Sequence, residues 1–197
     1  MDETVPQSHG PYVNHIDLPK DKQFDLGLIP MSAKPFHIGH EFLINRAAND
    51  CSHVIVFVSI KDRERKGELK ILGKHMKDIW DEHLIKVMPQ NVTIQFSAGS
   101  PIKDAYQKLS DLKDSSIKIA TYSDSNDALN YDYENARCIS FLRDVDSPQI
   151  SGKEMREFIL KNDFDKFNLY SHTKLTKNQN KMIFNKLQNK SEFIKVF

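Results

Sequence analysis

Short apolar runs alternate with stretches of helical spacing along most of this chain of 197 residues. Residues 23–29 form a run of strand length, and the run at 53–60, HVIVFVSI, is apolar enough for a strand buried on both faces of a parallel sheet. Between them, residues 39–49 carry apolar positions three and four apart, which predicts a helix. This order predicts a β-α-β unit at the start of the fold.

The alternation continues through the middle of the chain. Residues 71–88 have helical spacing and are followed by Pro89, which cannot continue a helix. The remaining pattern predicts a strand at 91–97, a helix at 101–112, a strand at 117–122, a weaker helix at 127–134 and a strand at 137–142. We therefore expect an α/β fold, a Rossmann-like doubly wound parallel sheet with its ligand site at the carboxyl ends of the strands.

From Ser151 onward the pattern becomes helical, with helices predicted at 151–162 and 173–190 and a short turn around 164–169. We divide the chain into three parts. Residues 1–22 are expected to form a flexible N-terminal arm, residues 23–162 an α/β domain, and residues 163–197 a helical C-terminal extension packed on that domain. The last helix is rich in Asn, Gln and Lys. It is the surface at which we expect any homo-oligomer contact.

Composition excludes several classes of protein. No apolar run approaches the roughly 20 residues that a membrane helix requires, and residues 1–22 lack the apolar core of a secretory signal. The net charge of +1 gives no general attraction to nucleic acid or to a membrane. Cys51 and Cys138 have no partners at metal-ligand spacing, so we interpret them as buried free thiols and expect no metal ion held by protein ligands. These features favour a cytoplasmic protein with small-molecule partners.

The tetrapeptide His37-Ile38-Gly39-His40 lies between the first predicted strand and the first predicted helix. A helix N-terminus offers N–H groups and a partial positive charge, and Gly39 lets a phosphate approach the backbone closely. The two imidazoles can donate hydrogen bonds to phosphate oxygens. The alternative is that His37 only caps the helix and His40 is an ordinary surface histidine.

A second motif, Ile150-Ser151-Gly152-Lys153-Glu154-Met155-Arg156, begins the first helix of the C-terminal part. Ser151 can cap the helix and contact a phosphate oxygen, and Arg156 carries a fixed fork of donors that suits phosphate. Taken alone, the same residues also fit an ordinary capping box between Ser151 and Glu154.

The first motif, with Pro35-Phe36 before it, resembles the HxGH motif of the nucleotidylyltransferase superfamily, and the second resembles that superfamily's ISxTxxR or SGTxxR motif. The resemblance covers about residues 23–162. It departs from the family pattern in two places. Lys153 replaces the usual threonine and adds a positive charge toward a triphosphate, and the loop between Gly27 and Pro35 is longer than in the common GxFxPxHxGH form.

The resemblance implies an enzyme in which a phosphate on an acceptor attacks the α-phosphorus of a nucleoside triphosphate and releases pyrophosphate. It implies catalytic roles for His37 and His40 on the triphosphate and for Arg156 on the leaving pyrophosphate, with Mg²⁺ bound through the nucleotide phosphates. The nucleotide-binding residues expected on this basis are Ser32, Gly39, Ile150, Ser151, Gly152 and Lys153. The segment SGKEMR looks more like the motif of nicotinamide-mononucleotide adenylyltransferases than the cytidylyltransferase form, which favours ATP as donor and nicotinamide mononucleotide as an example of the acceptor.

Candidate residues for binding a phosphorylated acceptor lie near the predicted strand ends. Lys34 shortly precedes the HxGH motif, and Arg63 and Arg65 follow the second strand within KDRERKG. A solvated loop is the plainer interpretation of these charges. Tyr122 ends a later strand, where it either stacks on a base or is an ordinary strand-end tyrosine. Trp80 lies on the apolar face of its helix, and we expect it in the core.

Three other functions stay open at this point. A cytidylyltransferase would use CTP with a sugar phosphate or a phospho-alcohol, and a nucleotide-binding module would bind ATP without releasing pyrophosphate. Class I aminoacyl-tRNA synthetases also carry the HIGH tetrapeptide, and Lys174-Leu175-Thr176-Lys177 resembles part of their KMSKS loop. The chain argues against this last class, because it has no room for an anticodon domain and no strongly basic surface for tRNA.

Overall fold

The computed structural model describes residues 22–141 and 148–188. The arm predicted at 1–22 therefore lies outside the described residues except for Lys22, whose Nζ donates hydrogen bonds to the carbonyl oxygens of Ala48 and Asn49. The last residue of the strand predicted at 137–142 and the last two of the helix predicted at 173–190 also lie outside them. None of the helices within these two ranges is both long enough and apolar enough to cross a membrane.

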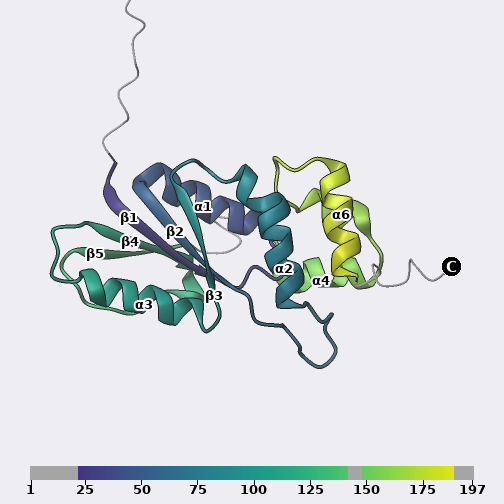
Figure 1. Cartoon of the computed structure of the whole chain (residues 1–197), viewed down its shortest axis with the longest axis horizontal. Coiled ribbons are helices and arrows are strands. Elements are labelled where there is room, and N and C mark those ends of the chain that lie inside the picture. Colours follow the sequence, from purple (N-terminus) through teal and green to yellow (C-terminus); the bar gives the residue numbers. More distant parts are fainter. Residues whose placement is uncertain (1–21, 142–147, 189–197) are drawn as a thin grey trace, which may run out of the picture.

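Five parallel strands form one sheet in the order β3-β2-β1-β4-β5 (Figure 1). Their bounds are β1 Phe24–Met31, β2 Cys51–Ser59, β3 Val92–Ser97, β4 Ile119–Asp124 and β5 Ala136–Phe141. The chain runs outward from β1 to β3 and then returns to the other side of β1 for β4 and β5. Ligands of open α/β sheets bind outside the carboxyl ends of the strands at such a reversal. The predicted Rossmann-like parallel sheet is confirmed.

Helices cover both faces of this sheet, with α1 Ile38–Asp50 on one side and α3 Pro101–Leu112 on the other (Figure 1). Because successive strand residues point to opposite faces, Leu28 packs in the cluster on the α3 side and Ile29 in the cluster on the α1 side. Both side chains are fully buried. The β1–α1 connection then places the first turn of α1, which carries the HxGH motif, at the carboxyl end of β1.

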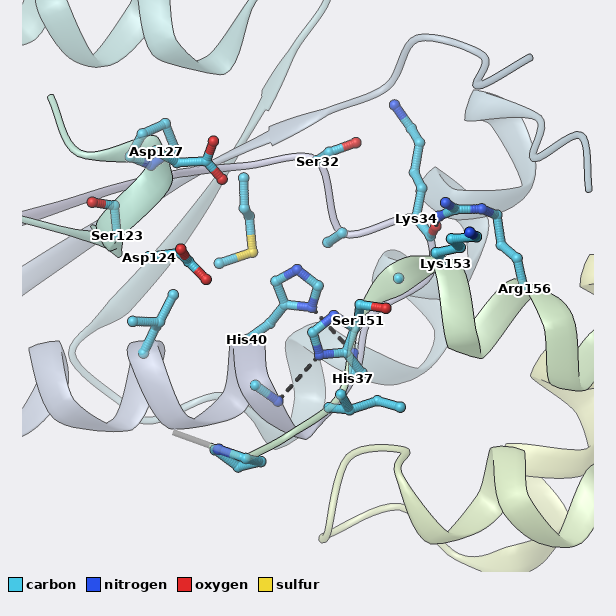
Figure 2. A pocket seen from close by; sticks show the side chains of 18 of the residues that line it. Ser32, Lys34, His37, His40, Ser123, Asp124, Asp127, Ser151, Lys153 and Arg156 are labelled. Atoms are coloured by element: carbon cyan, nitrogen blue, oxygen red, sulfur yellow. Dashed lines mark hydrogen bonds between the residues drawn. The ribbon is translucent and has the colours of Figure 1, made fainter. Parts of the chain in front are cut away.

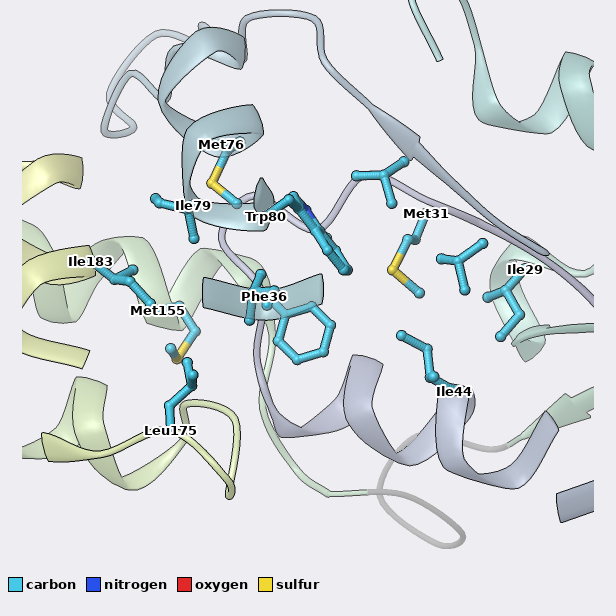
Figure 3. Packing of buried hydrophobic residues seen from close by; sticks show 14 of the residues in the cluster. Ile29, Met31, Phe36, Ile44, Met76, Ile79, Trp80, Met155, Leu175 and Ile183 are labelled. Atoms are coloured by element: carbon cyan, nitrogen blue, oxygen red, sulfur yellow. The ribbon is translucent and has the colours of Figure 1, made fainter. Parts of the chain in front are cut away.

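A single helical segment connects β2 to β3, as the sequence predicts for 71–88. Its parts are α2 Gly73–Ile79, a π-helical turn (η1) Trp80–Leu84 and a 3-10 turn (η2) Ile85–Val87. Trp80 is fully buried and meets the ring of Phe36 edge-on, with 5.3 Å between ring centroids (Figure 3). The predicted core position of Trp80 is confirmed.

The C-terminal part consists of α4 Gly152–Leu160, α5 Phe164–Leu169 and α6 Lys177–Leu187. The sequence predicts only a turn at 164–169. That segment is a short helix because Asp163 accepts a hydrogen bond from Lys166 N and Phe167 packs against Phe184. The three helices share the core of α1 and α2, where Figure 3 groups Met155, Leu175 and Ile183 with Phe36, Met76 and Ile79.

The helix predicted at 127–134 is wrong. Only a 3-10 turn (η3), Ser125–Asp127, precedes β5, and the rest of the segment is irregular. Leu129, Tyr131 and Tyr133 alternate at the period of an extended chain and pack in the cluster on the α3 face. The helical assignment overlooked this period-two spacing.

Candidate active site

A pocket opens at the switch point of the sheet, at the carboxyl ends of β1 and β4 (Figure 2). Its volume of about 450 Å³ is within the range of small-molecule sites. The β1–α1 loop, the first turn of α1, the β2–α2 loop, the end of β4 and the first turn of α4 all line it. The predicted site residues on its wall are Ser32, Lys34, His37, Gly39, His40, Arg63, Arg65, Ile150, Ser151, Gly152, Lys153 and Arg156. Tyr122 is the one predicted site residue that does not line it.

The first turn of α1 is capped by the two histidines of the HxGH motif. His37 is the N-cap residue, and its Nδ1 accepts a hydrogen bond from Gly39 N at 3.2 Å. His40 Nδ1 accepts a hydrogen bond from His37 N, also at 3.2 Å. The ring centroids are 3.8 Å apart. The two imidazole rings therefore form a reciprocal capping box. At other helices the same box is made by a Ser or Thr at the N-cap and a Glu or Gln three residues later.

This arrangement fixes which nitrogen carries the proton in each neutral ring. A nitrogen that accepts an N–H hydrogen bond carries no proton itself, so the neutral imidazole must carry its proton on Nε2. Figure 2 shows the ring of His40 directed into the pocket. The two sequence interpretations of His37 and His40 are thus compatible, because one nitrogen caps the helix while the other is an N–H donor.

The glycines of the two motifs make room for side chains of their own motifs. A Cβ added at Gly39 would lie 3.0 Å from Cε1 and Nδ1 of His37. A Cβ added at Gly152 would lie 3.1 Å from Nη1 of Arg156. The first contact is with a ring held by a hydrogen bond, and the second is with the end of a long side chain. Close packing within each motif is therefore a reason for glycine that the sequence alone does not reveal.

The first turn of α4 is capped by Ser151 and Glu154. Glu154 Oε2 accepts hydrogen bonds from Ser151 N at 2.8 Å and from Ser151 Oγ at 2.7 Å, and Ser151 Oγ accepts one from Glu154 N at 3.3 Å. This is the capping box that the sequence offered as an alternative. Ser151 lines the pocket, but its hydroxyl is engaged at the helix end. Lys153, on the same turn, is exposed and also lines the pocket.

Arg156 connects the second motif to the loop before the first. Its side chain is buried, and Nη1 donates a hydrogen bond of 2.7 Å to the carbonyl oxygen of Lys34. Nη2 forms an ion pair of 2.8 Å with Glu68 Oε2, while Nε is buried with no hydrogen-bond partner among the described residues. Burial and the neighbouring charge of Arg63 lower the pKa of Arg156 from its usual value. This arginine therefore holds α4 against the β1–α1 loop.

Lys34 lies three residues before His37 and is only 5% exposed. Its Nζ donates a hydrogen bond of 2.9 Å to Ser59 Oγ, at the end of β2. No carboxylate within the described parts of the chain lies within ion-pair distance of Nζ. Burial, with the charge of Arg63, lowers the pKa of Lys34 to about 8. A buried ammonium on a pocket wall, without a carboxylate partner, favours the binding of an anion.

The β2–α2 loop contributes Arg63 and Arg65 to the pocket wall. The backbone of Arg63 exchanges two hydrogen bonds with that of Ile71, which folds the loop back on itself. The guanidinium of Arg63 pairs with Glu68, the same carboxylate that Arg156 contacts. The sequence analysis assigned Arg63 to the acceptor and Arg156 to the leaving pyrophosphate. In the structure both arginines contact the carboxylate of Glu68.

Two predictions fail around β4 and β5. Tyr122 is fully buried, and its hydroxyl donates to Asp50 at 3.1 Å and lies 3.5 Å from Cys51 Sγ, so it is a core residue and cannot stack on a ligand. The reason is its register, since residue 122 faces α1 while the next residue faces the pocket. Cys51 is buried as predicted, but Cys138 is exposed on the edge strand β5.

The end of β4 carries pocket residues that the sequence analysis did not choose as candidates, although they directly follow Tyr122. Ser123, Asp124 and Asp127 line the pocket on the side opposite Lys34, Lys153 and Arg156, with the histidines between (Figure 2). Ser123 is 5% exposed, and its Oγ has no hydrogen-bond partner among the described residues. The available signal was the polar Ser-Asp pair directly after a buried strand. One end of the pocket is thus basic and suits phosphates, and the other is acidic and suits groups that donate hydrogen bonds.

Within the described ranges, no group of three or more His, Cys, Asp and Glu side chains could hold a metal ion. Asp124 and Asp127 are the carboxylates on the pocket wall. A divalent cation at this site would therefore take most of its ligands from phosphate oxygens and water, as Mg²⁺ commonly does.

The fold and the pocket define a class: Rossmann-like proteins in which an HxGH helix N-terminus and a basic second motif face one pocket. Residues 26–80, which contain β1, the HxGH motif and β2, match the family described as Citrate lyase ligase C-terminal domain. None of the curated proteins matches the chain. The family match covers about a quarter of the chain and includes the HxGH motif, and it supports the resemblance to the HxGH nucleotidylyltransferase superfamily that the two motifs carry.

Among solved structures, the chain is similar to Plasmodium falciparum nicotinic acid mononucleotide adenylyltransferase complexed with NaAD. The two share 14% sequence identity with a TM-score of 0.46. The alignment covers 82% of this chain and 96% of that chain.

Proposed function

We propose that this protein is a nucleotidylyltransferase that transfers a nucleoside monophosphate to a phosphorylated small molecule and releases pyrophosphate. ATP is the preferred donor, and nicotinamide mononucleotide heads the acceptors to be tested. The observation that carries the proposal is the convergence of two helix N-termini, those of α1 and α4, on one pocket beside the buried Lys34. Helix N-termini with added cations are suited to several phosphate groups at once.

In the proposed reaction, an oxygen of the acceptor phosphate attacks the α-phosphorus of the triphosphate. A new P–O bond forms to the acceptor oxygen as the bond from the α-phosphorus to the bridging oxygen breaks, and pyrophosphate leaves with that bridging oxygen. A phosphate acceptor is already deprotonated near neutral pH, so no protein base is needed. Catalysis then depends on alignment and on stabilising the charge of the transition state.

The residues take roles in that step according to where they lie. Nε2–H of His40, directed into the pocket, donates to a phosphate oxygen as charge develops on it. Lys153 and Arg156, at the basic end, hold the leaving pyrophosphate, while Lys34 holds the acceptor phosphate. The acidic end, with Ser123 and Asp124, holds the hydroxyl groups of the nucleoside.

Mg²⁺ belongs to the proposal as a cation carried by the nucleotide, where it would neutralise part of the phosphate charge. The alignment of the acceptor with the α-phosphorus then depends on the hydrogen-bond donors of the protein.

The test is pyrophosphate release from ATP and, separately, from CTP, each with Mg²⁺ and a panel of phosphorylated acceptors. We expect release with one donor–acceptor pair, and a His40→Ala control that removes it. Release with CTP and a sugar phosphate or phospho-alcohol would identify a cytidylyltransferase instead. Nucleotide binding with no release across the panel would favour a binding module and contradict the proposal.

A second candidate follows from the family match, because that family is named for a ligase. The same pocket could present a carboxylate to the α-phosphorus, which would give an acyl-adenylate and pyrophosphate. Carboxylic acids in the acceptor panel, with hydroxylamine to trap an acyl-adenylate as its hydroxamate, separate this reaction from transfer to a phosphate. Hydroxamate formation would replace the phosphate acceptor with a carboxylate and leave the nucleotide end of the site unchanged.

A further inference from the structure

One carboxylate oxygen, Oε2 of Glu68, receives N–H groups from two arginines that line the pocket. Arg63 donates to it from Nε at 3.2 Å and from Nη2 at 2.9 Å. Arg156 approaches the same oxygen with Nη2 at 2.8 Å. Three N–H groups around one oxygen resemble the environment that proteins give to a phosphate oxygen. Glu68 therefore occupies an anion-binding position formed by Arg63 and Arg156, which we call the seat.

A tight turn delivers this carboxylate to the arginines. Glu68 N donates a hydrogen bond of 3.0 Å to the carbonyl oxygen of Arg65, and Gly67 between them has a φ of 80°. A glycine at the third position of such a turn is typical of type II. The turn lies in the β2–α2 loop, which extends beyond the sheet on the side of α4 (Figure 1). Glu68 is thus carried by a surface loop, while Arg156 is anchored in a helix.

The contact limits what Arg156 can do in this state. Its side chain is 6% exposed, Nη1 is bonded to the carbonyl oxygen of Lys34, and Nη2 is bonded to Glu68. A phosphate group that approached Nη2 would meet the carboxylate of Glu68 at close range. Two negative charges at such a distance repel each other, so the carboxylate and a phosphate cannot share the seat.

We propose that Glu68 is an internal anion that holds the pyrophosphate seat of the ligand-free protein and is displaced when the polyphosphate binds. This inference rests on the proposed function, in which Arg156 binds the leaving pyrophosphate. It adds Arg63 to that seat in place of the acceptor role predicted from sequence. The return of Glu68 to the arginines favours release of pyrophosphate after transfer, at the cost of weaker binding before it.

The test is calorimetric titration of the full chain with inorganic pyrophosphate, without nucleotide or acceptor. An internal competitor that fills the seat nine-tenths of the time weakens binding about tenfold, so Glu68→Gln should bind pyrophosphate about tenfold more tightly. Glu68→Asp keeps the charge but shortens the reach to Arg156, and it should change the affinity in the same direction. The matched control is Glu64→Gln, on the same loop, which loses only an exposed pair with Lys70 and should bind as the wild type does.

The outcomes separate this inference from the proposed function. Equal or weaker binding by Glu68→Gln, with clear binding by the wild type, overturns the displacement and leaves the pyrophosphate site in place. An identical gain in Glu64→Gln would show a general charge effect of the loop and also overturns it. Absence of pyrophosphate binding in every folded variant and in the wild type would remove both the displacement and the proposed function.

Discussion

The N-termini of α1 and α4, which face the pocket, are both closed by a capping box, but different side chains form it. At α1, His37 and His40 cap each other's backbone, and at α4 Ser151 and Glu154 do the same. The serine hydroxyl and the carboxylate are both engaged by their box, and the carboxylate adds negative charge where a phosphate would bind. An imidazole caps through Nδ1 and keeps an N–H on Nε2.

This difference explains why, in the proposed function, other residues of the second helix bind phosphate. At α1 the capping residue His40 is also the phosphate donor of the proposal. At α4 the donors are Lys153 and Arg156, one and four positions along the helix from Gly152. In the proposal, capping and phosphate binding are thus combined at one helix end and divided at the other, and substitutions can test each part.

The largest effect is expected where the two roles are combined. His40→Ala should lower turnover by at least about a hundredfold, because it removes a donor to the transition-state phosphates. It should also destabilise the fold by about 1 kcal/mol through loss of the cap. His40→Asn offers an amide oxygen in place of Nδ1, so it should recover the stability, as measured by chemical unfolding, while turnover stays low. Near-normal turnover in His40→Asn would reduce His40 to a capping residue.

The pH dependence of acceptor binding comes next, since Lys34 lines the pocket that both helix ends face. Its pKa is lowered to about 8, so the ammonium loses its proton as the pH rises through that value. The acceptor KM should therefore rise about tenfold between pH 7 and pH 9, with kcat much less affected. Lys34→Met should have a high KM that does not change over this range. An unchanged KM in the wild type would place the acceptor elsewhere.

The same lysine shows what the sequence could predict. The β-α-β order, the two motifs and the position of Lys34 follow from local spacing, because strand and helix periods and capping signals are short-range. The lowered pKa of Lys34 depends on its burial beside Ser59, at the end of β2, and on the charge of Arg63, in the β2–α2 loop. Such burial and such a neighbouring charge cannot be predicted from local spacing, because they arise only when segments distant in the sequence pack together.

Glu68 and Tyr122 illustrate the same limit in two ways. In the sequence, Glu68 is one charge in a charged loop, and only its contact with Arg156, 88 positions away, makes it part of the site. Tyr122 was placed at the correct strand end but on the wrong face. A shift of one residue in a strand exchanges core and pocket, which is why Ser123 lines the site and Tyr122 does not.

A matched pair of glycine substitutions gives a smaller effect that sharpens the comparison. Gly39→Ala brings a methyl group to 3.0 Å from the ring of His37, which is held by its hydrogen bond to the backbone. We expect turnover to fall about tenfold, since small displacements of catalytic groups are costly. Gly152→Ala meets only the flexible end of Arg156 at 3.1 Å, so its loss should be smaller. Steady-state kinetics of the two variants side by side would check the order, and a larger loss at Gly152 would reverse it.

The smallest effect on turnover is expected at Ser151, if this residue only caps α4. Ser151→Ala should lower the free energy of unfolding by about 1 kcal/mol, as for other N-cap serines, and change turnover less than about threefold. Ser151→Thr is the matched control, because it keeps a capping hydroxyl. A loss of turnover as large as that of His40→Ala, without a matching loss in Ser151→Thr, would mean that the hydroxyl leaves Glu154 to bind phosphate in the complex. The two helix ends would then perform the same work, and the division between capping and binding at α4 would hold only for the ligand-free protein.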